Sequence, residues 1–372
     1  MDKEIWVKEI PGVFLAETVK LWIKNEYSLK KVTDNEQPKK KDTIIVSEKD
    51  KDAYDHNLFE ILVYEEFSKE LFRYVSHEVG INFDFYYLRN ALEYAKSEKV
   101  STLFTGSSYG LFGIDRRLLT NAANLSMTSQ DLFYAICGIN EVLEKNQKVK
   151  NIVLCCSYYY FFSDFSMSQN SFERGLMSQI YYPLFKNMHN AALVLPRKCS
   201  LPQSDLFDIE SVVKAISLKE YQKGYFTDQR RRAGFATRVW SNSARDWDQL
   251  TVLDKEEAGK IRAELHNKNI MRTATYEENI VLFSKLVGFC AERGINFICL
   301  VPPATSYYRK ALNPEFKEIF YQTINDTDGV IHLIDLFDNS CFAEEDFNDT
   351  DHLSESGANK LTQYVLQVLE TI

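Results

Sequence analysis

Two short segments hold the residue types of nucleophilic catalysis. Residues 106–108 (Gly-Ser-Ser) follow the apolar run 100–104, and residues 349–352 (Asp-Thr-Asp-His) precede a stretch of helical periodicity. The three-residue spacing from Asp349 to His352 lets the carboxylate hydrogen-bond to one imidazole nitrogen while the other nitrogen faces outward. An imidazole oriented in this way is the base that a serine nucleophile needs. The two segments together therefore predict a Ser-His-Asp arrangement.

Each segment taken alone also has a purely structural interpretation. Glycine and serine are both frequent in tight turns, so a Gly-Ser-Ser sequence after a strand often does no chemistry. An aspartate just before a helix, such as Asp349, is favourable near the positive end of the helix dipole. The catalytic interpretation gains weight if both segments lie at strand-to-helix junctions of one parallel sheet, because the carboxyl ends of such strands form the ligand-binding crevice.

The periodicity of the chain places both segments at such junctions. Short apolar runs typical of buried strands alternate with stretches of helical periodicity. This alternation predicts a parallel sheet covered by helices on both faces, which is a three-layer α/β/α domain. The expected strands are 100–104, 151–156, 295–301 and 330–335, and the expected helices are 128–146, 276–293, 314–325 and 354–370.

Two regions fall outside this alternation. Residues 1–98 are predicted to be a helical N-terminal extension, and residues 99–372 to be the α/β domain. Within that domain the alternation is lost at about 158–275, which predicts a helical insertion that caps the active-site end. The helical stretches of the extension are 5–30, 57–79 and 83–97, with a charged, solvated connection from 30 to 55.

The order of these residues resembles the SGNH hydrolase superfamily, in which a Gly-Asp-Ser block or a variant such as Gly-Ser-Ser comes first and an Asp-x-x-His block comes last. The branch that it resembles contains the teichoic-acid D-alanylation protein and the alginate O-acetyltransferases. The resemblance covers residues 100–157 and 280–372. It implies a flavodoxin-like fold with Ser108 as the nucleophile, His352 as the general base and Asp349 as its orienting partner.

Two neighbouring residues compete for these roles. Ser107 is the alternative nucleophile, although Ser108 holds the third place in the block. Asp351 is left outside the triad, because its adjacency to His352 in the sequence is expected to point it away from the imidazole.

The resemblance is incomplete at the residues that would stabilise an oxyanion. The family has a glycine in its second block and an asparagine in its third, and the corresponding stretches here are 121–126 and 156–159. Asn124 or Ser126 is expected to donate a hydrogen bond beside the backbone amide of Ser108. The third block has no asparagine, which weakens the oxyanion assignment and leaves the triad untouched.

The resemblance implies serine-dependent acyl transfer on a carbohydrate, by an O-acetyltransferase or an esterase of cell-surface polysaccharide modification. The transferase is preferred because the branch modifies polysaccharides and the insertion offers room for a second substrate. No bound cofactor is expected, and acetyl-CoA is the expected acyl donor. The alternative is a non-catalytic protein of the same fold that binds a glycan or a partner, which the missing asparagine favours.

Two features of the insertion have both a binding and a structural interpretation. The cluster of Arg230, Arg231 and Arg232 is either a solvated patch or a site for an anionic glycan or the phosphates of an acyl donor. The aromatic run 158–162 is either core or a platform for sugar rings. The structural interpretation is favoured for both.

Composition narrows the remaining classes. The 372 residues carry a net charge of −9, which argues against sequence-independent nucleic-acid binding. The histidines lack the spacing of metal-binding motifs, so no metal site is expected. No apolar run reaches the ~18 residues of a membrane span, and the first residues lack the order of a signal peptide. With seven cysteines in no paired spacing, these features predict a cytoplasmic protein.

Overall fold

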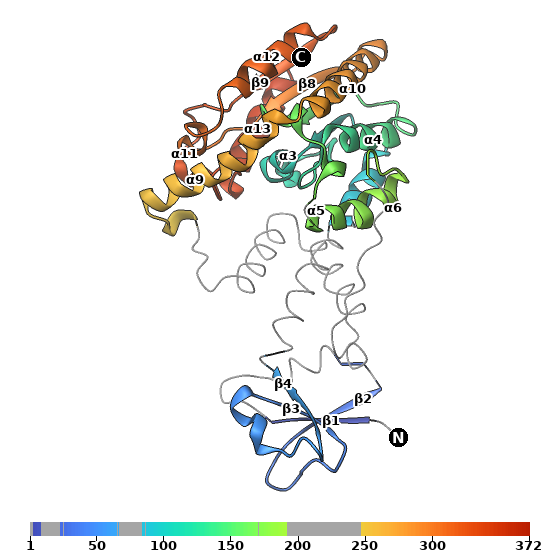
Figure 1. Ribbon diagram of the computed structural model, residues 1–372. Coiled ribbons are helices and arrows are strands. Elements are labelled where there is room, and N and C mark those ends of the chain that lie inside the picture. Colours follow the sequence, from blue (N-terminus) through green and yellow to red (C-terminus); the bar gives the residue numbers. More distant parts are fainter. Residues whose placement is uncertain are drawn as a thin grey trace. The chain divides into compact units, whose positions relative to one another are not determined.

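The computed structural model describes residues 3–8, 23–24, 26–64, 66, 84–85, 87–169, 171–191 and 247–372. The chain divides into two compact units, a first one formed mainly by residues before 84 and a larger one formed by most of the remainder. The division therefore falls earlier than the predicted boundary at 98–99. Figure 1 labels the elements of both units.

The first unit contains a four-stranded parallel sheet, so the prediction of a helical extension is wrong for this part of the chain. The strands are β1 (Lys3–Val7), β2 (Tyr27–Lys31), β3 (Thr43–Val46) and β4 (Glu60–Val63), in the order β2-β1-β3-β4. Two apolar clusters lie on opposite faces, one of Ile5, Val7, Ile45 and Leu62 and the other of Trp6, Ile44, Val46 and Val63.

The length of these apolar runs explains the error. A strand buried on both faces loses the polar-apolar alternation that identifies strands, and a run of four or five apolar residues also fits one turn of a helix. The solvated connection predicted over 30–55 contains β3 for the same reason. Helix is correct at 87–95, whereas 9–22 and 67–83 lie outside the described residues.

The larger unit is built on a five-stranded parallel sheet, and its α/β class is as predicted. Its order is β6-β5-β7-β8-β9, with β5 (Thr102–Gly106), β6 (Ala122–Asn124), β7 (Asn151–Cys155), β8 (Asn296–Val301) and β9 (Ile331–Asp335). Four of these strands match predicted ones. Strand β6 was not predicted, because Ala-Ala-Asn is short and weakly apolar. The order is that of flavodoxin-like sheets, whose ligand crevice lies at the carboxyl ends of the first and third strands, here β5 and β7.

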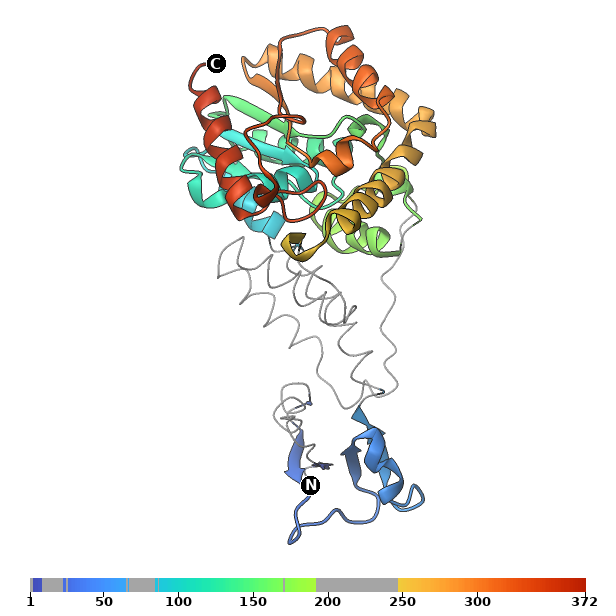
Figure 2. The ribbon, with the colours of Figure 1, turned by 90° about the vertical axis from the view of Figure 1, so that its left-hand side faces the viewer.

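Helices cover both faces of this sheet, as Figures 1 and 2 show. Helix α4 contacts α10, and α3 contacts α13. The carboxyl ends of β5 and β9 lead into the segments that carry the predicted catalytic residues. The bounds are α3 (Ser108–Gly113), α4 (Leu132–Leu143), α10 (Thr273–Glu292), α11 (Ser306–Arg309), α12 (Glu315–Asp326) and α13 (Glu355–Leu369).

The predicted insertion is helical where the structure describes it. It contains the short helices α5 (Ser171–Leu176) and α6 (Tyr182–Phe185) and the longer α9 (Val252–Asn267). Helix α9 begins with a capping box in which Thr251 and Asp254 satisfy each other's backbone amides. Residues 192–246, which include Arg230, Arg231 and Arg232, lie outside the described residues.

The aromatic run 158–162 belongs to the core. Each of its five side chains is at most 9% exposed, and Phe161 packs edge-on against Phe283 of α10 with ring centroids 4.9 Å apart. The structural interpretation of this run is therefore confirmed. Within the described ranges, no helix combines the length and apolar character that a bilayer crossing requires.

Candidate active site

The serine segment occupies a sharp turn between β5 and α3. Strand β5 ends at Gly106, whose φ is +118°. A Cβ atom at this position would lie 2.1 Å from the carbonyl oxygen of Cys155, so only glycine fits. Ser107 is the N-cap of α3, and its hydroxyl accepts a hydrogen bond from the amide of Tyr109. Ser108 is the first residue of the helix and is half-buried, which leaves its hydroxyl at the crevice.

His352 meets Ser108 across a sequence separation of 244 residues, with 2.8 Å between Nε2 and the serine Oγ. This distance is the hydrogen-bonding separation that the sequence analysis expects. The other ring nitrogen, Nδ1, lies 3.1 and 3.0 Å from the two carboxylate oxygens of Asp349. Asp349 is itself held in place, because its Oδ1 accepts hydrogen bonds from the backbone amides of Asp351 and His352. The geometry is that of a nucleophile, a base and an orienting group.

The environment of His352 favours its protonated form. The imidazole stacks on Tyr109 with ring centroids 5.4 Å apart and contacts Phe112 at 4.9 Å. Burial lowers the pKa of His352, but the charges of Asp349 and Asp351 and the hydrogen bond to Asp349 outweigh it, so the net shift is upward from 6.5. This environment therefore stabilises the imidazolium form of the ring.

Asp351 is part of the site, contrary to the expectation that it points away from His352. Its Oδ1 lies 3.5 Å from Nδ1 of the imidazole. Nε of Arg262 donates to both carboxylate oxygens, at 3.1 and 3.0 Å, and the hydroxyl of Tyr109 donates to Oδ2 at 2.7 Å. The tight turn at 349–352 brings both aspartates to the same side of the ring, which adjacency in sequence alone does not reveal.

Arg262 is a site residue that the sequence analysis missed. It lies on α9, inside the segment assigned to the insertion, and 89 positions separate it from Asp351. The side chain of Asp351 is only 1% exposed, so a cation had to be expected beside it. The sequence offered one signal, namely that a second aspartate beside the histidine needs a basic residue to balance its charge. That signal does not indicate which of the basic residues fills the role.

The two predicted oxyanion residues have different surroundings. The amide nitrogen of Asn124 donates to the carbonyl oxygen of Gly110, and its oxygen accepts from the amide of Ser126, so this side chain braces α3. The hydroxyl of Ser126 is buried without a hydrogen-bond partner in the described part of the chain, and so is that of Ser157 after β7. Ser126 therefore keeps an unused hydroxyl next to Gly110 of α3, whereas the side-chain amide of Asn124 is engaged at both its nitrogen and its oxygen.

Among the residues that the structure describes, two groups of side chains have the composition of a metal site, and both make other interactions. They are Asp349, Asp351 and His352, and Asp131, Asp164 and His189. In the first group Arg262 already supplies the cation for Asp351. In the second, Asp131 accepts hydrogen bonds from the backbone amides of Tyr134 and Phe165, and Asp164 accepts from Ser166 and Asn190. The second group therefore braces loops of the protein, whereas the first belongs to the site around Ser108.

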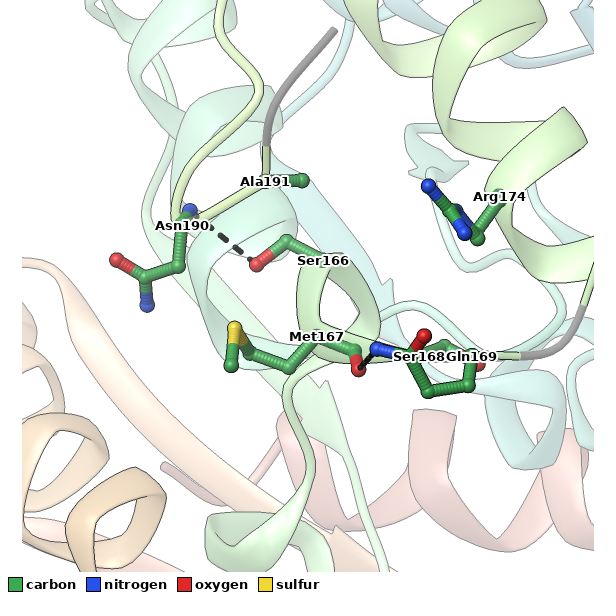
Figure 3. Close-up of a pocket in the computed structure, with 7 residues that line it drawn as sticks. All are labelled: Ser166, Met167, Ser168, Gln169, Arg174, Asn190 and Ala191. Carbon is green, nitrogen blue, oxygen red and sulfur yellow. Dashed lines mark hydrogen bonds between the residues drawn. The ribbon is translucent and has the colours of Figure 1, made fainter. Parts of the chain in front are cut away.

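Two cavities lie near loops of the larger unit. Figure 3 shows the smaller one, of about 170 Å³, in which the backbone amide of Asn190 donates to the hydroxyl of Ser166 and Arg174 is among the lining residues. The larger one, of about 550 Å³, is lined by aromatic and charged side chains that include Tyr158, Tyr321 and Lys317. Neither is lined by Ser108 or His352, so neither is assigned to the reacting groups.

Comparison with known proteins supports no argument about this chain. No protein-family model and no curated protein matches the chain. Among solved structures, the chain is similar to one from Streptococcus pneumonia whose description names a platelet activating factor. The two share 9% identity at a TM-score of 0.35, over 76% of this chain and 92% of the other. A similarity at this level carries no information about the activity.

Proposed function

We propose that this chain is a serine-dependent acyl-transfer enzyme of the SGNH type, with Ser108 as nucleophile, His352 as base and Asp349 as orienting group. The observation that carries the proposal is the 2.8 Å contact between Ser108 and His352, made by two loops that the sheet topology brings to one edge. The upward pKa shift of the imidazole and its two-point contact with Asp349 support the same roles.

The reaction follows from these positions. Oγ of Ser108 attacks the carbonyl carbon of an acyl donor while Nε2 of His352 takes the serine proton. The bond between the carbonyl carbon and the leaving group then breaks, and the imidazolium returns the proton to that group. An acceptor hydroxyl next attacks the acyl-serine, losing its proton to His352, and serine leaves with that proton. The amide of Ser108 and the hydroxyls of Ser126 and Ser157 are the proposed donors to the oxyanion.

The substrates are part of the proposal. The acceptor is a carbohydrate hydroxyl, in modification of a cell-surface polysaccharide, and water in its place makes the enzyme an esterase. The resemblance to a branch that modifies polysaccharides supports this choice. Acetyl-CoA is the proposed donor for an enzyme of the cytoplasm, and the Arg230–Arg232 cluster is the proposed contact for an anionic substrate.

A second candidate function is binding without catalysis. The engagement of Asn124 with Gly110 and the missing asparagine of the third block both favour it. Labelling by a fluorophosphonate separates the two functions, because this reagent needs an activated serine and no particular substrate. Covalent labelling on the upper plateau of the pH profile supports the enzyme, whereas a folded protein that stays unlabelled there supports the binding protein.

The activity is expected to fall as the pH is lowered through the raised pKa of His352. His352 must be neutral to accept the serine proton, and its pKa is raised above 6.5. Activity is therefore complete above this raised pKa and is lost as the pH falls through it, about tenfold for each further pH unit. The measurement is kcat/KM for p-nitrophenyl acetate between pH 5 and 9. A midpoint below 6.5, or a flat profile, would show that His352 is not the base.

Asp349→Asn is expected to slow acyl transfer roughly a hundredfold or more, and less than loss of the nucleophile does. The asparagine amide can present a donor to Nδ1 and so favour the wrong tautomer, while the carboxylate of Asp351 stays 3.5 Å from the same nitrogen. The steady-state kcat measures the effect. Asp338→Asn is the control, since Asp338 is exposed and pairs with Arg309. Equal rates in both variants would remove Asp349 from the mechanism.

A further inference from the structure

A chain of polar side chains extends from Asp351 into the protein. Arg262 and Tyr109 both donate to the carboxylate. From Tyr109 the chain continues through hydroxyl and imidazole contacts of 3.0, 3.1 and 2.5 Å, in the order Tyr109, Tyr159, His266 and Tyr308. All of these side chains except Arg262 are buried. The network fixes the carboxylate of Asp351 from several elements at once.

Two carboxylates therefore face one imidazole nitrogen. Asp349 is partly exposed, with 46% of its side-chain surface accessible, whereas Asp351 is 1% exposed. A buried anion acts on a nearby charge through a poorly screening medium, so Asp351 affects His352 strongly although it lies farther away. Two uncompensated carboxylates would hold the imidazole in its protonated form, which cannot accept a proton from serine.

The other titratable groups around His352 are uncharged near neutral pH. Burial and neighbouring charges raise the pKa of Tyr109 and Tyr308 well above 10.0, and that of Tyr159 to about 12. Burial and the charge of Arg262 lower the pKa of His266 to about 3. Among the described residues facing His352, the fixed charges are thus the two aspartates and Arg262.

We infer that Arg262 is a positioning residue for the general base: by binding both oxygens of Asp351 it holds this carboxylate beside His352 and offsets its charge, leaving Asp349 as the one uncompensated partner. The inference rests on the proposed function, because it matters only if His352 acts as a base. It also gives α9 a part in the site, through a residue that touches neither serine nor imidazole.

Removing the charge of Arg262 and removing the charge of Asp351 are expected to shift the pKa of His352 in opposite directions. Arg262→Met leaves the carboxylate of Asp351 without its cation and is expected to raise the pKa of His352 by about one unit. Asp351→Asn leaves the guanidinium of Arg262 without its anion and is expected to lower the pKa of His352 by a similar amount. The double variant, which removes both charges, is expected to lie within about 0.3 units of the native protein. A purely structural role would not produce shifts of opposite sign that cancel.

The experiment is NMR titration of the histidine side chains in the full-length chain, with the His352 signal assigned from its loss in His352→Gln. Arg117→Met is the control, because Arg117 makes a comparable two-point contact with the buried Asp115. It is expected to leave the His352 titration unchanged. Shifts of the same sign in Arg262→Met and Asp351→Asn, or shifts no larger than in the control, would overturn the inference.

Folding does not obscure this test. Arg262→Met leaves a buried carboxylate unpaired and can fail to fold, but the double variant replaces the whole ion pair by neutral groups and is expected to be tolerated. If Arg262→Met does not fold, the difference in the pKa of His352 between Asp351→Asn and the double variant is enough to test the role of Arg262. The titration needs no activity: a failed fluorophosphonate reaction refutes the proposed function, whereas successful labelling with an unshifted His352 refutes only the role of Arg262.

Discussion

Ser108→Ala is expected to abolish fluorophosphonate labelling and to slow acyl transfer roughly a thousandfold or more, because it removes the Oγ atom that forms the covalent bond. The hydroxyl is half-buried at the edge of the sheet and bonds only to His352 among the described residues. Its loss is therefore expected to change the free energy of unfolding by less than about 1 kcal/mol. Labelling intensity and kcat, with the urea midpoint beside them, measure both effects.

Ser107→Ala is the matched control for that variant. Ser107 caps α3 through the amide of Tyr109, so its removal costs about 1 kcal/mol of stability and leaves the nucleophile in place. Labelling should persist in this variant. Labelling lost in Ser107→Ala and retained in Ser108→Ala would transfer the nucleophilic role to Ser107, the alternative that the sequence leaves open.

Gly106→Ala is expected to destabilise the larger unit by about 3 kcal/mol or more and to remove activity together with stability. The residue has φ of +118°, and the new Cβ would lie 2.1 Å from the backbone oxygen of Cys155. The backbone must shift to relieve this clash, and Ser108 is two residues away. The urea midpoint, followed by circular dichroism, gives the stability.

Gly288→Ala provides the comparison for Gly106→Ala. Gly288 lies inside α10, and a Cβ there meets nothing within 4 Å. Alanine is therefore expected to stabilise the helix by up to about 1 kcal/mol. If both glycine variants were equally stable, the turn that presents Ser108 would not have the conformation described.

The residues of the proposed triad could be picked out from the sequence because their signals are local. Gly106 and Ser108 directly follow an apolar run, and the spacing of Asp349 and His352 needs no knowledge of the fold. Arg262 could not be found in this way, since its contact with Asp351 depends on how α9 packs against the loop before α13. Asp351 was misplaced because adjacency in sequence does not fix side-chain direction in a tight turn.

The errors in the fold have an equally physical origin. Strands β1 and β3 are short and buried on both faces, so their apolar residues carry neither a two-residue nor a clear helical period. Strand β6 pairs with β5 through backbone hydrogen bonds. The small side chains of Ala122 and Ala123 are compatible with a strand, but they give no sequence pattern that predicts one. The apolar runs of β7 and β8 are longer, and they could be assigned to strands from the sequence.

The most direct test of the central claim is to locate the fluorophosphonate adduct by peptide mass spectrometry after labelling at a pH on the upper plateau of the kcat/KM profile. Ser108 activated by His352 predicts one adduct, on Ser108, whose formation slows as the pH falls and is absent in His352→Gln. An adduct on any other residue, or a native protein without adduct under these conditions, would contradict the claim.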